Sequence, residues 1–311
     1  MKKIGYVGTY YENGSEGIYR FEFENGILSN PTLFSKVKNA KYIKYHQDML
    51  ISLGDFNQGS GVCLIDRSGD IIDRLIYEQK TSCYVDAKKD RIYTTNYHIG
   101  SLSEICTKKG SLKLIETIVI EDKGGCHQVL FVDDIFIVIC LHKDEVRMFD
   151  EELEMIGSIH FEQGFGPRHG VLSHDKRWLY VIGELSNQLA AVDLRHSSVV
   201  KMVPVLGDDQ INLKGSAAIR MSDDGKYVVV STRDKNVLSL IAVDQENMEL
   251  KQVVSTQGDH PRDILIVDGY ILVANRKSNQ LLSFKFENGW IDPNPVSMIK
   301  IIEGVSIAME E

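Results

Sequence analysis

The 311-residue chain contains no long hydrophobic run. Its longest uninterrupted apolar stretch covers only the seven residues 135–141, whereas a helix that crosses a bilayer needs about 20. Lys2 and Lys3 are followed by a short apolar stretch that ends before Tyr10, so we find no signal-peptide core. These absences exclude a helical membrane span and predict a cytoplasmic protein.

Paired cysteines are absent as well. Cys63, Cys83, Cys106, Cys126 and Cys140 are odd in number and scattered, and no two of them form a C-x-x-C pair. Disulfide frameworks and structural zinc sites both depend on paired cysteines at short spacing. We therefore expect reduced thiols and no zinc site, which again fits the cytoplasm.

Positive charge is scarce and dispersed. The chain has 35 Lys and Arg against 44 Asp and Glu, a formal net charge of −9, and no basic run. Nucleic-acid binding requires a clustered positive face, so we expect no nucleic-acid partner. At 43% hydrophobic and 25% charged residues, the composition is that of an ordinary folded protein.

Helical periodicity is also missing, because no stretch of 11 or more residues keeps apolar side chains at helical spacing. A short apolar strand recurs instead. Its copies lie at residues 3–10, 49–54, 91–96, 135–140, 178–183, 227–232 and 270–275. From residue 49 onward the copies start 42, 44, 43, 49 and 43 residues apart, near the period of about 40–50 residues of a four-stranded propeller blade.

A companion segment precedes most of these copies. It lies at residues 40–46, 82–87, 126–131, 167–173, 216–221 and 261–266, with a seventh copy at 304–309. Since the first strand has no companion before it, we expect the last segment to pair with residues 3–10 and close a ring. The sequence predicts an all-β, seven-bladed β-propeller of four-stranded antiparallel blades, as one domain over residues 1–311. A large sandwich or barrel would not explain seven two-part repeats with a terminal split.

Polar side chains recur where the predicted inner strands begin and where the strands after them end. In a propeller such positions converge around a central channel. The starts carry His127, Arg168, His169, Ser216 and Arg262, and the ends carry Asn96, Glu184, Arg233, Asn275 and Arg276. Several cations and one carboxylate suit an anionic small molecule, because the arginine fork matches carboxylate or phosphate oxygens.

These residues lie in motifs that resemble the seven-bladed propeller lactonases, a family that includes bacterial 6-phosphogluconolactonase and the fungal carboxymuconate-lactonizing enzyme. Gly166-Pro167-Arg168-His169, Leu179-Tyr180-Val181 and Glu184-Leu185-Ser186 are similar to its GPRH…YV…ELS signature. Further similarities follow in chain order in Tyr6-Val7-Gly8-Thr9-Tyr10, Asn96-Tyr97-His98-Ile99-Gly100-Ser101, Gly125-Cys126-His127, Ser216-Ala217-Ala218-Ile219, and His260-Pro261-Arg262 with Ala274-Asn275. The resemblance covers nearly the whole chain.

Three features depart from the family pattern. Thr232 precedes Arg233 where Asn or Asp is usual, the turns at residues 87–90 and 132–134 lack Pro and Gly, and Lys41-Tyr42 replaces a common Pro-Ser pair. We expect most of these changes to fall in outer turns.

The resemblance implies hydrolysis of a lactone, with an anionic phosphosugar lactone as the expected small-molecule partner. Water attack on the ester carbonyl needs a base and a positive group facing the oxyanion. Glu184 or His127 is the expected base, and Arg168 and Arg233 are the expected oxyanion-stabilising groups. Substrate binding is expected of His169, Arg262, Asn275 and Arg276.

Other chemistries have little support. Inner positions rich in Arg and His, with Glu184 the main acid, disfavour a divalent metal. The sequence has no phosphate loop, dinucleotide fingerprint or G-x-S-x-G elbow, so we expect no cofactor and no metal. Without a coiled coil or apolar tail, a monomer is expected.

Two alternatives stay open. One is an enzyme of the same fold that acts on another anionic lactone or catalyses a cycloisomerisation. The other is a non-catalytic binding propeller, in which Glu184 and an arginine of the adjacent blade would only brace two blades.

Overall fold

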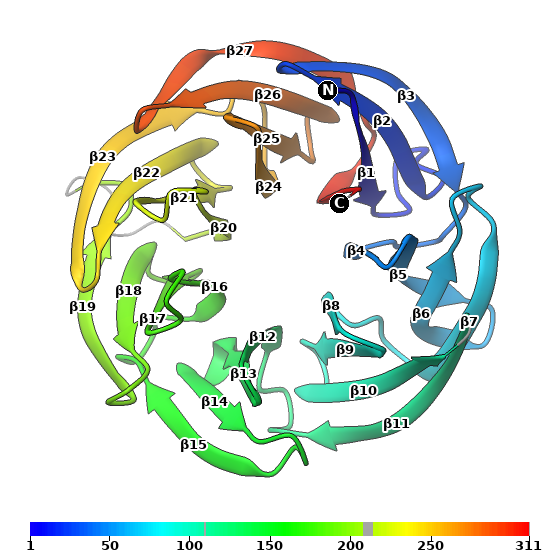
Figure 1. Ribbon diagram of the computed structural model, residues 1–311, viewed down its shortest axis with the longest axis horizontal. Helices are drawn as coiled ribbons and strands as arrows, with labels where there is room; N and C mark the ends of the chain where they lie inside the picture. The colour runs from blue at the N-terminus through cyan, green and yellow to red at the C-terminus, as the bar shows by residue number, and fades with distance from the viewer. Residues whose placement is uncertain (109, 208–213, 311) are drawn as a thin grey trace.

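Seven four-stranded antiparallel sheets stand in a ring around a central opening (Figure 1). The computed structural model describes residues 1–108, 110–207 and 214–310. Within these ranges the helical content is a single 3-10 turn, η1 (Leu141–Lys143), and no helix has the length and hydrophobicity of a membrane span. The predicted all-β, seven-bladed propeller is therefore confirmed.

Each blade runs outward from the centre through four strands hydrogen-bonded in order. The innermost strands are β4 (Ile43–His46), β8 (Tyr84–Lys88), β12 (Cys126–Val132), β16 (Pro167–Leu172), β20 (Ser216–Met221), β24 (Pro261–Val267) and β28 (Gly304–Met309). The second strands are β1 (Lys3–Thr9), β5 (Met49–Phe56), β9 (Arg91–Asn96), β13 (Ile135–Cys140), β17 (Trp178–Gly183), β21 (Tyr227–Thr232) and β25 (Tyr270–Asn275).

The two outer strands of each blade complete the ring. The third strands are β2 (Ile18–Glu24), β6 (Gly59–Ile65), β10 (Ser101–Lys108), β14 (Glu145–Phe149), β18 (Gln188–Asp193), β22 (Val237–Asp244) and β26 (Gln280–Glu287). The outermost strands are β3 (Ile27–Ser35), β7 (Ile71–Glu78), β11 (Ser111–Val119), β15 (Met155–His160), β19 (Ser198–Pro204), β23 (Asn247–Ser255) and β27 (Trp290–Lys300).

The two ends of the chain share one blade. β28 pairs antiparallel with β1, so that Val7 lies opposite Ile307 and Tyr6 opposite Ala308. The pairing predicted for the first and last segments is therefore confirmed. In a closed ring every blade has a neighbour on both sides, which limits the exposed sheet edges that favour aggregation.

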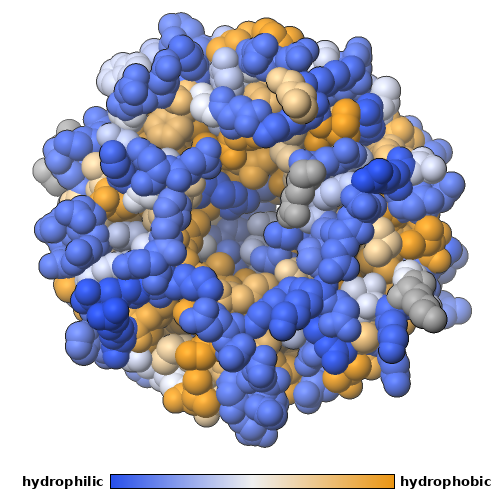
Figure 2. Space-filling view, in the orientation of Figure 1, coloured by the Kyte–Doolittle hydropathy of each residue, from blue (hydrophilic) through white to orange (hydrophobic). Residues whose placement is uncertain are grey.

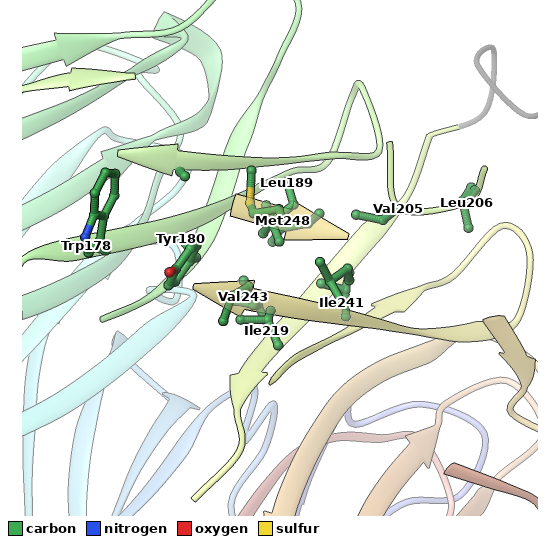
Figure 3. Close-up of a cluster of buried hydrophobic side chains, with 13 residues drawn as sticks. Trp178, Tyr180, Leu189, Val205, Leu206, Ile219, Ile241, Val243 and Met248 are labelled. Carbon is green, nitrogen blue, oxygen red and sulfur yellow. The ribbon is translucent and has the colours of Figure 1, made fainter. Parts of the chain in front are cut away.

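Apolar side chains fill the space between neighbouring blades. In the cluster of Figure 3, Tyr180 and Leu189 of one blade pack against Ile219 and Ile241 of the next, and all four are buried. Burying each such side chain contributes about 1.5–3 kcal/mol. The Tyr180 hydroxyl donates to the carbonyl of Gln245 at 2.7 Å, so this core tyrosine leaves no polar atom unpaired.

Local irregularities turn particular side chains toward the channel. The register of β12, β16 and β24 shifts at their first residues, which leaves His127, Arg168 and Arg262 as extra residues outside the ladder. A bulge of this kind changes the direction in which a side chain points. The bulges therefore explain why these three residues depart from the alternation of their strands.

Two of these bulges, in β12 and β24, and a similar irregularity in β28 are each followed by a residue that holds neighbouring blades together. Inner strands have one edge without a sheet partner, and its buried N–H groups need acceptors. Side-chain oxygens of the adjacent blade supply them: Gln128 accepts from Gly170 at 2.6 Å, Asp263 from Ile307 at 2.8 Å and Ser306 from Ile43 at 3.1 Å. These bonds fix the inner strands relative to one another and so position the site.

Candidate active site

A narrow cavity of about 20 Å³ lies where the inner strands begin. Its wall comprises Tyr10, Lys41, Tyr42, Cys83, His127, Arg168, His169, Arg262, Asp263 and Val305. A space of this size accommodates about one water molecule, so a larger ligand would lie across its mouth. Lys41 and Tyr42, one of the departures from the family pattern, are part of this wall, because they directly precede the inner strand β4.

Arg168 is the central cation of the site and is only 2% exposed. Its Nη1 donates to the carbonyl of Ala217 at 2.6 Å. Its Nε lies 2.8 Å from Oε2 of Glu184, an ion pair by distance in which the N–H does not point at the oxygen. Burial, followed by the charge of Arg262, lowers the pKa of Arg168 to about 9, so the guanidinium is charged at neutral pH.

Glu184 follows β17 and lies between two arginines. Its Oε1 is 3.0 Å from Nη2 of Arg233, which belongs to the next blade. Burial alone would raise the pKa of Glu184, but the charges of Arg168 and Arg233 outweigh it and lower the pKa. The carboxylate is therefore ionised and, at 24% side-chain exposure, still open to water. The interblade ion pair foreseen as a bracing contact is present.

The two histidines of the site form a directional chain. Nη1 of Arg168 lies 3.2 Å from Nδ1 of His169, and Nε2 of His169 lies 3.1 Å from Nδ1 of His127. Arginine only donates, so Nδ1 of His169 accepts and its Nε2 carries the proton. His127 then accepts at Nδ1 and keeps its own proton on Nε2. In its neutral form His127 therefore offers an N–H donor and has no free basic nitrogen.

Both imidazoles are kept neutral. Burial, followed by the charge of Arg168, lowers the pKa of His127 and of His169 well below the ordinary value. The side chains are 5% and 3% exposed. This neutrality preserves the direction of the hydrogen-bond chain at physiological pH.

Acidification is expected to destabilise the fold through this pair. The unfolded chain protonates these histidines below pH 6.5 or so, while the folded protein does not, so the unfolded state gains stability as pH falls. Each histidine should reduce the free energy of unfolding by up to about 1.4 kcal/mol per pH unit in that range. Urea unfolding from pH 7 to pH 5 measures this slope. It should be shallower in His169→Gln and unchanged in His174→Gln, which alters an exposed histidine; equal slopes in all three would contradict the argument.

Asn275 and Arg276, predicted to bind substrate, do not line the cavity. Asn275 is fully buried, and its amide donates to the carbonyl of Thr256 at 2.9 Å. Arg276 pairs with Glu303 at 2.6 Å and Glu12 at 3.0 Å. Both side chains therefore make structural contacts within the protein, and their role in substrate binding stays a prediction.

Several cavity residues were not among the predicted site residues: Tyr10, Lys41, Tyr42, Cys83 and Asp263. The wall positions Lys41, Cys83, His127, Arg168, Arg262 and Val305 are each the second residue of a companion segment. Comparing the seven segments column by column would have found Lys41 and Cys83.

Burial shifts the pKa of two of the unpredicted residues. Burial raises the pKa of Cys83 to about 11, so Cys83 is a thiol and not a nucleophilic thiolate at neutral pH. Burial opposes charge on Asp263 and raises its pKa, although Arg220 and two backbone N–H groups favour the carboxylate. Within the described residues no three His, Cys, Asp or Glu side chains are grouped to hold a metal ion.

A wider chamber of about 500 Å³ occupies the rest of the channel. All seven inner strands contribute to its wall, and Tyr42 lines both spaces. Its cations are paired, Lys44 with Asp86 and Arg220 with Asp263. Figure 2 shows the hollow at the centre of the ring, with hydrophobic residues along part of its wall. Lys41 and Arg262, by contrast, lie in the wall of the narrow cavity.

Comparison with known proteins places this geometry in context. A family model described as "Lactonase, 7-bladed beta-propeller" matches residues 4–299. The 6-phosphogluconolactonase of Bacillus subtilis is 28% identical over 318 aligned residues, covering 91% of each chain. A Lactobacillus plantarum protein of known structure matches over 100% of both chains with a TM-score of 0.93 and 24% identity. The periplasmic gluconolactonase of Pseudomonas aeruginosa has a TM-score of 0.87 and 21% identity over 100% of this chain and 99% of that one. The two solved structures share the fold.

Proposed function

The chain belongs to the seven-bladed β-propeller lactonase family, and on this basis we propose that it hydrolyses the ester of a phosphorylated sugar lactone, as a 6-phosphogluconolactonase does. The observation that carries the proposal is the buried Arg168 with Glu184 and Arg233 beside it and the neutral histidine pair attached to it. Such a group combines a base with donors for an oxyanion. The curated relative from Bacillus subtilis, which bears that name, supports the same substrate class.

The reaction needs one water molecule and no cofactor. Glu184 removes a proton from water as the water oxygen attacks the lactone carbonyl carbon. The carbonyl oxygen becomes an oxyanion, which the guanidiniums of Arg168 and Arg233 and the N–H of His127 stabilise. When the intermediate collapses, the ring C–O bond breaks and the leaving alkoxide takes the proton from Glu184. The product is the open hydroxy acid.

His127 acts as a donor in this scheme, which distinguishes it from the alternative base. We expect His127→Ala to lower kcat about 100-fold, as the loss of one oxyanion donor does. His127→Gln should lose only about tenfold, because its amide again presents an N–H. Steady-state rates of the two variants test this. Equal losses in both would indicate that His127 is needed as a base.

The test of the function is the initial rate of 6-phosphogluconolactone hydrolysis with the spontaneous rate subtracted. A rate well above background supports the proposal. A folded protein without such a rate refutes it, and activity on other anionic lactones in the same assay would then favour the same-fold alternative. We also propose a cytoplasmic location, which the five free cysteines support.

A further inference from the structure

Two groups of polar side chains lie in and beside the narrow cavity, and of these only Glu184 and Arg233 are not part of its wall. The reaction group, His127, Arg168, Glu184 and Arg233, belongs to the neighbouring blades that contain β12, β16 and β20. The second group, Arg262, Lys41 and Tyr10, lies around β24, β28 and β4, which are also neighbours. β8 separates the groups on one side of the ring (Figure 1), whereas on the other side β20 and β24 are direct neighbours. A ligand across the mouth would contact both groups.

Among the described residues, neither cation of the second group has a carboxylate at ion-pair distance. Burial opposes the charge of Arg262, but the neighbouring Tyr10 and Glu184 outweigh burial and raise its pKa. Arg168, Arg233, Arg220 and Arg276 each have a carboxylate within 4.0 Å. Around Arg262 and Lys41, no described carboxylate oxygen lies within that distance. Both side chains are partly buried, and a cation that loses water without gaining a counter-charge is costly. An anion from outside would remove this cost.

Tyr10 adds a hydroxyl donor. Its backbone N–H donates to the carbonyl of Glu303 at 3.1 Å, and its ring lies 4.5 Å from the guanidinium carbon of Arg276. Arg276, fixed by Glu303 and Glu12, therefore positions the ring. The charge of Arg262 is the main influence that lowers the pKa of Tyr10, so the hydroxyl is close to that cation. Tyr10 and Arg262 both line the narrow cavity.

We propose that Lys41, Arg262 and Tyr10 form a subsite for a phosphoryl group of the substrate, separate from the residues that attack the ester. A phosphoryl ester has three strong acceptor oxygens and up to two negative charges, which match a lysine, an arginine fork and a hydroxyl. This proposal rests on the proposed function in one respect: the phosphoryl group that the subsite binds is part of the lactone substrate. It makes Lys41 and Tyr10 specificity-determining residues and Arg276 a positioning residue.

Equilibrium binding of the hydrolysis product tests the subsite without turnover. Isothermal calorimetry compares 6-phosphogluconate with gluconate, which lacks the phosphoryl group, on the wild type, Lys41→Met and Tyr10→Phe. Lys36→Met, which removes a lysine with a 74% exposed side chain, is the charge-matched control. We expect 6-phosphogluconate to bind the wild type about tenfold or more tightly than gluconate, an advantage that Lys41→Met largely abolishes and Tyr10→Phe reduces about threefold.

The outcomes separate the subsite from the activity. Lys41-dependent preference for 6-phosphogluconate without lactone hydrolysis would support the subsite and refute the proposed function. Lactone hydrolysis together with equal affinity for 6-phosphogluconate and gluconate would support the proposed function and refute the subsite. If Lys41→Met weakens both acids equally, or if Lys36→Met has the same effect, the phosphoryl assignment is overturned. Thermal unfolding of each variant shows that a loss of binding does not come from unfolding.

Discussion

Replacing Arg168 with alanine is expected to lower kcat for lactone hydrolysis by about 10²–10³-fold, the loss typical of removing one oxyanion donor from a dry site. Arg168 also carries the hydrogen bond that orients His169 and, through it, His127. One substitution therefore removes a positive charge and the constraint on the tautomer of His127. The measurement is the steady-state rate of the folded variant with spontaneous hydrolysis subtracted.

Arg168→Ala should also reduce stability by about 1–3 kcal/mol, because the carbonyl of Ala217 loses its donor and Glu184 loses one of its two counter-charges. Arg147→Ala is the matched control. Arg147 also forms ion pairs, with Glu145 at 2.7 Å and Glu121 at 3.1 Å, but lies on β14 away from the cavity. The control should lose stability and keep its rate. If both variants lose rate equally, Arg168 acts through the fold and not at the reacting ester.

The fold was predictable from the sequence because each blade repeats the same two-part pattern. A strand of four to eleven residues can bury its apolar face only against neighbouring blades, so the period of the repeat reflects the architecture directly. Ring closure was predictable because the companion segment at residues 304–309 has no strand after it and the first strand has no companion before it. The structure pairs the two as β28 and β1.

The site was only partly predictable. His127, Arg168 and Arg262 were found because they stand at the starts of the inner strands, and the structure shows a bulge at each of the three. Tyr10 was missed because it lies after β1, outside the inner-strand repeat. Asn275 and Arg276 were assigned to the substrate because strand ends reach the same face of the ring. Position on that face does not fix direction, and these side chains turn to Thr256, Glu303 and Glu12.

The choice between Glu184 and His127 as base could not be made from residue types. It depends on which nitrogen of His169 faces Arg168, a relation between side chains that composition and spacing do not contain. The 3.2 Å contact between Nη1 of Arg168 and Nδ1 of His169 determines which ring nitrogen carries the proton in His169 and in His127. With His127 assigned as donor, Glu184 is the carboxylate next to Arg168 that remains open to water.

Glu184→Gln is therefore expected to give a loss of about 10²–10⁴-fold in kcat, the range of general base catalysis. The side chain keeps nearly the same shape. The substitution leaves Arg168 and Arg233 charged and without their shared counter-ion, so oxyanion stabilisation should survive while proton removal does not. Glu145→Gln is the matched control, since Glu145 is a 7% exposed carboxylate paired with Arg147 outside the cavity. The control should keep its rate.

The pH profile adds an independent criterion for Glu184. Because the two arginines lower the pKa of Glu184, the wild-type kcat should stay level from pH 8 down to about 5, where an ordinary glutamate is still ionised. Raising the pH from 6 to 8, below the pKa of Arg168, should raise the rate of Glu184→Gln, since hydroxide replaces the missing base. A Glu184→Gln variant with near wild-type kcat, together with inactive His127→Gln, would instead make His127 the base. That result would require the hydrogen-bond chain to reverse, with His169 donating from Nδ1, a direction that the adjoining Nη1 of Arg168 opposes.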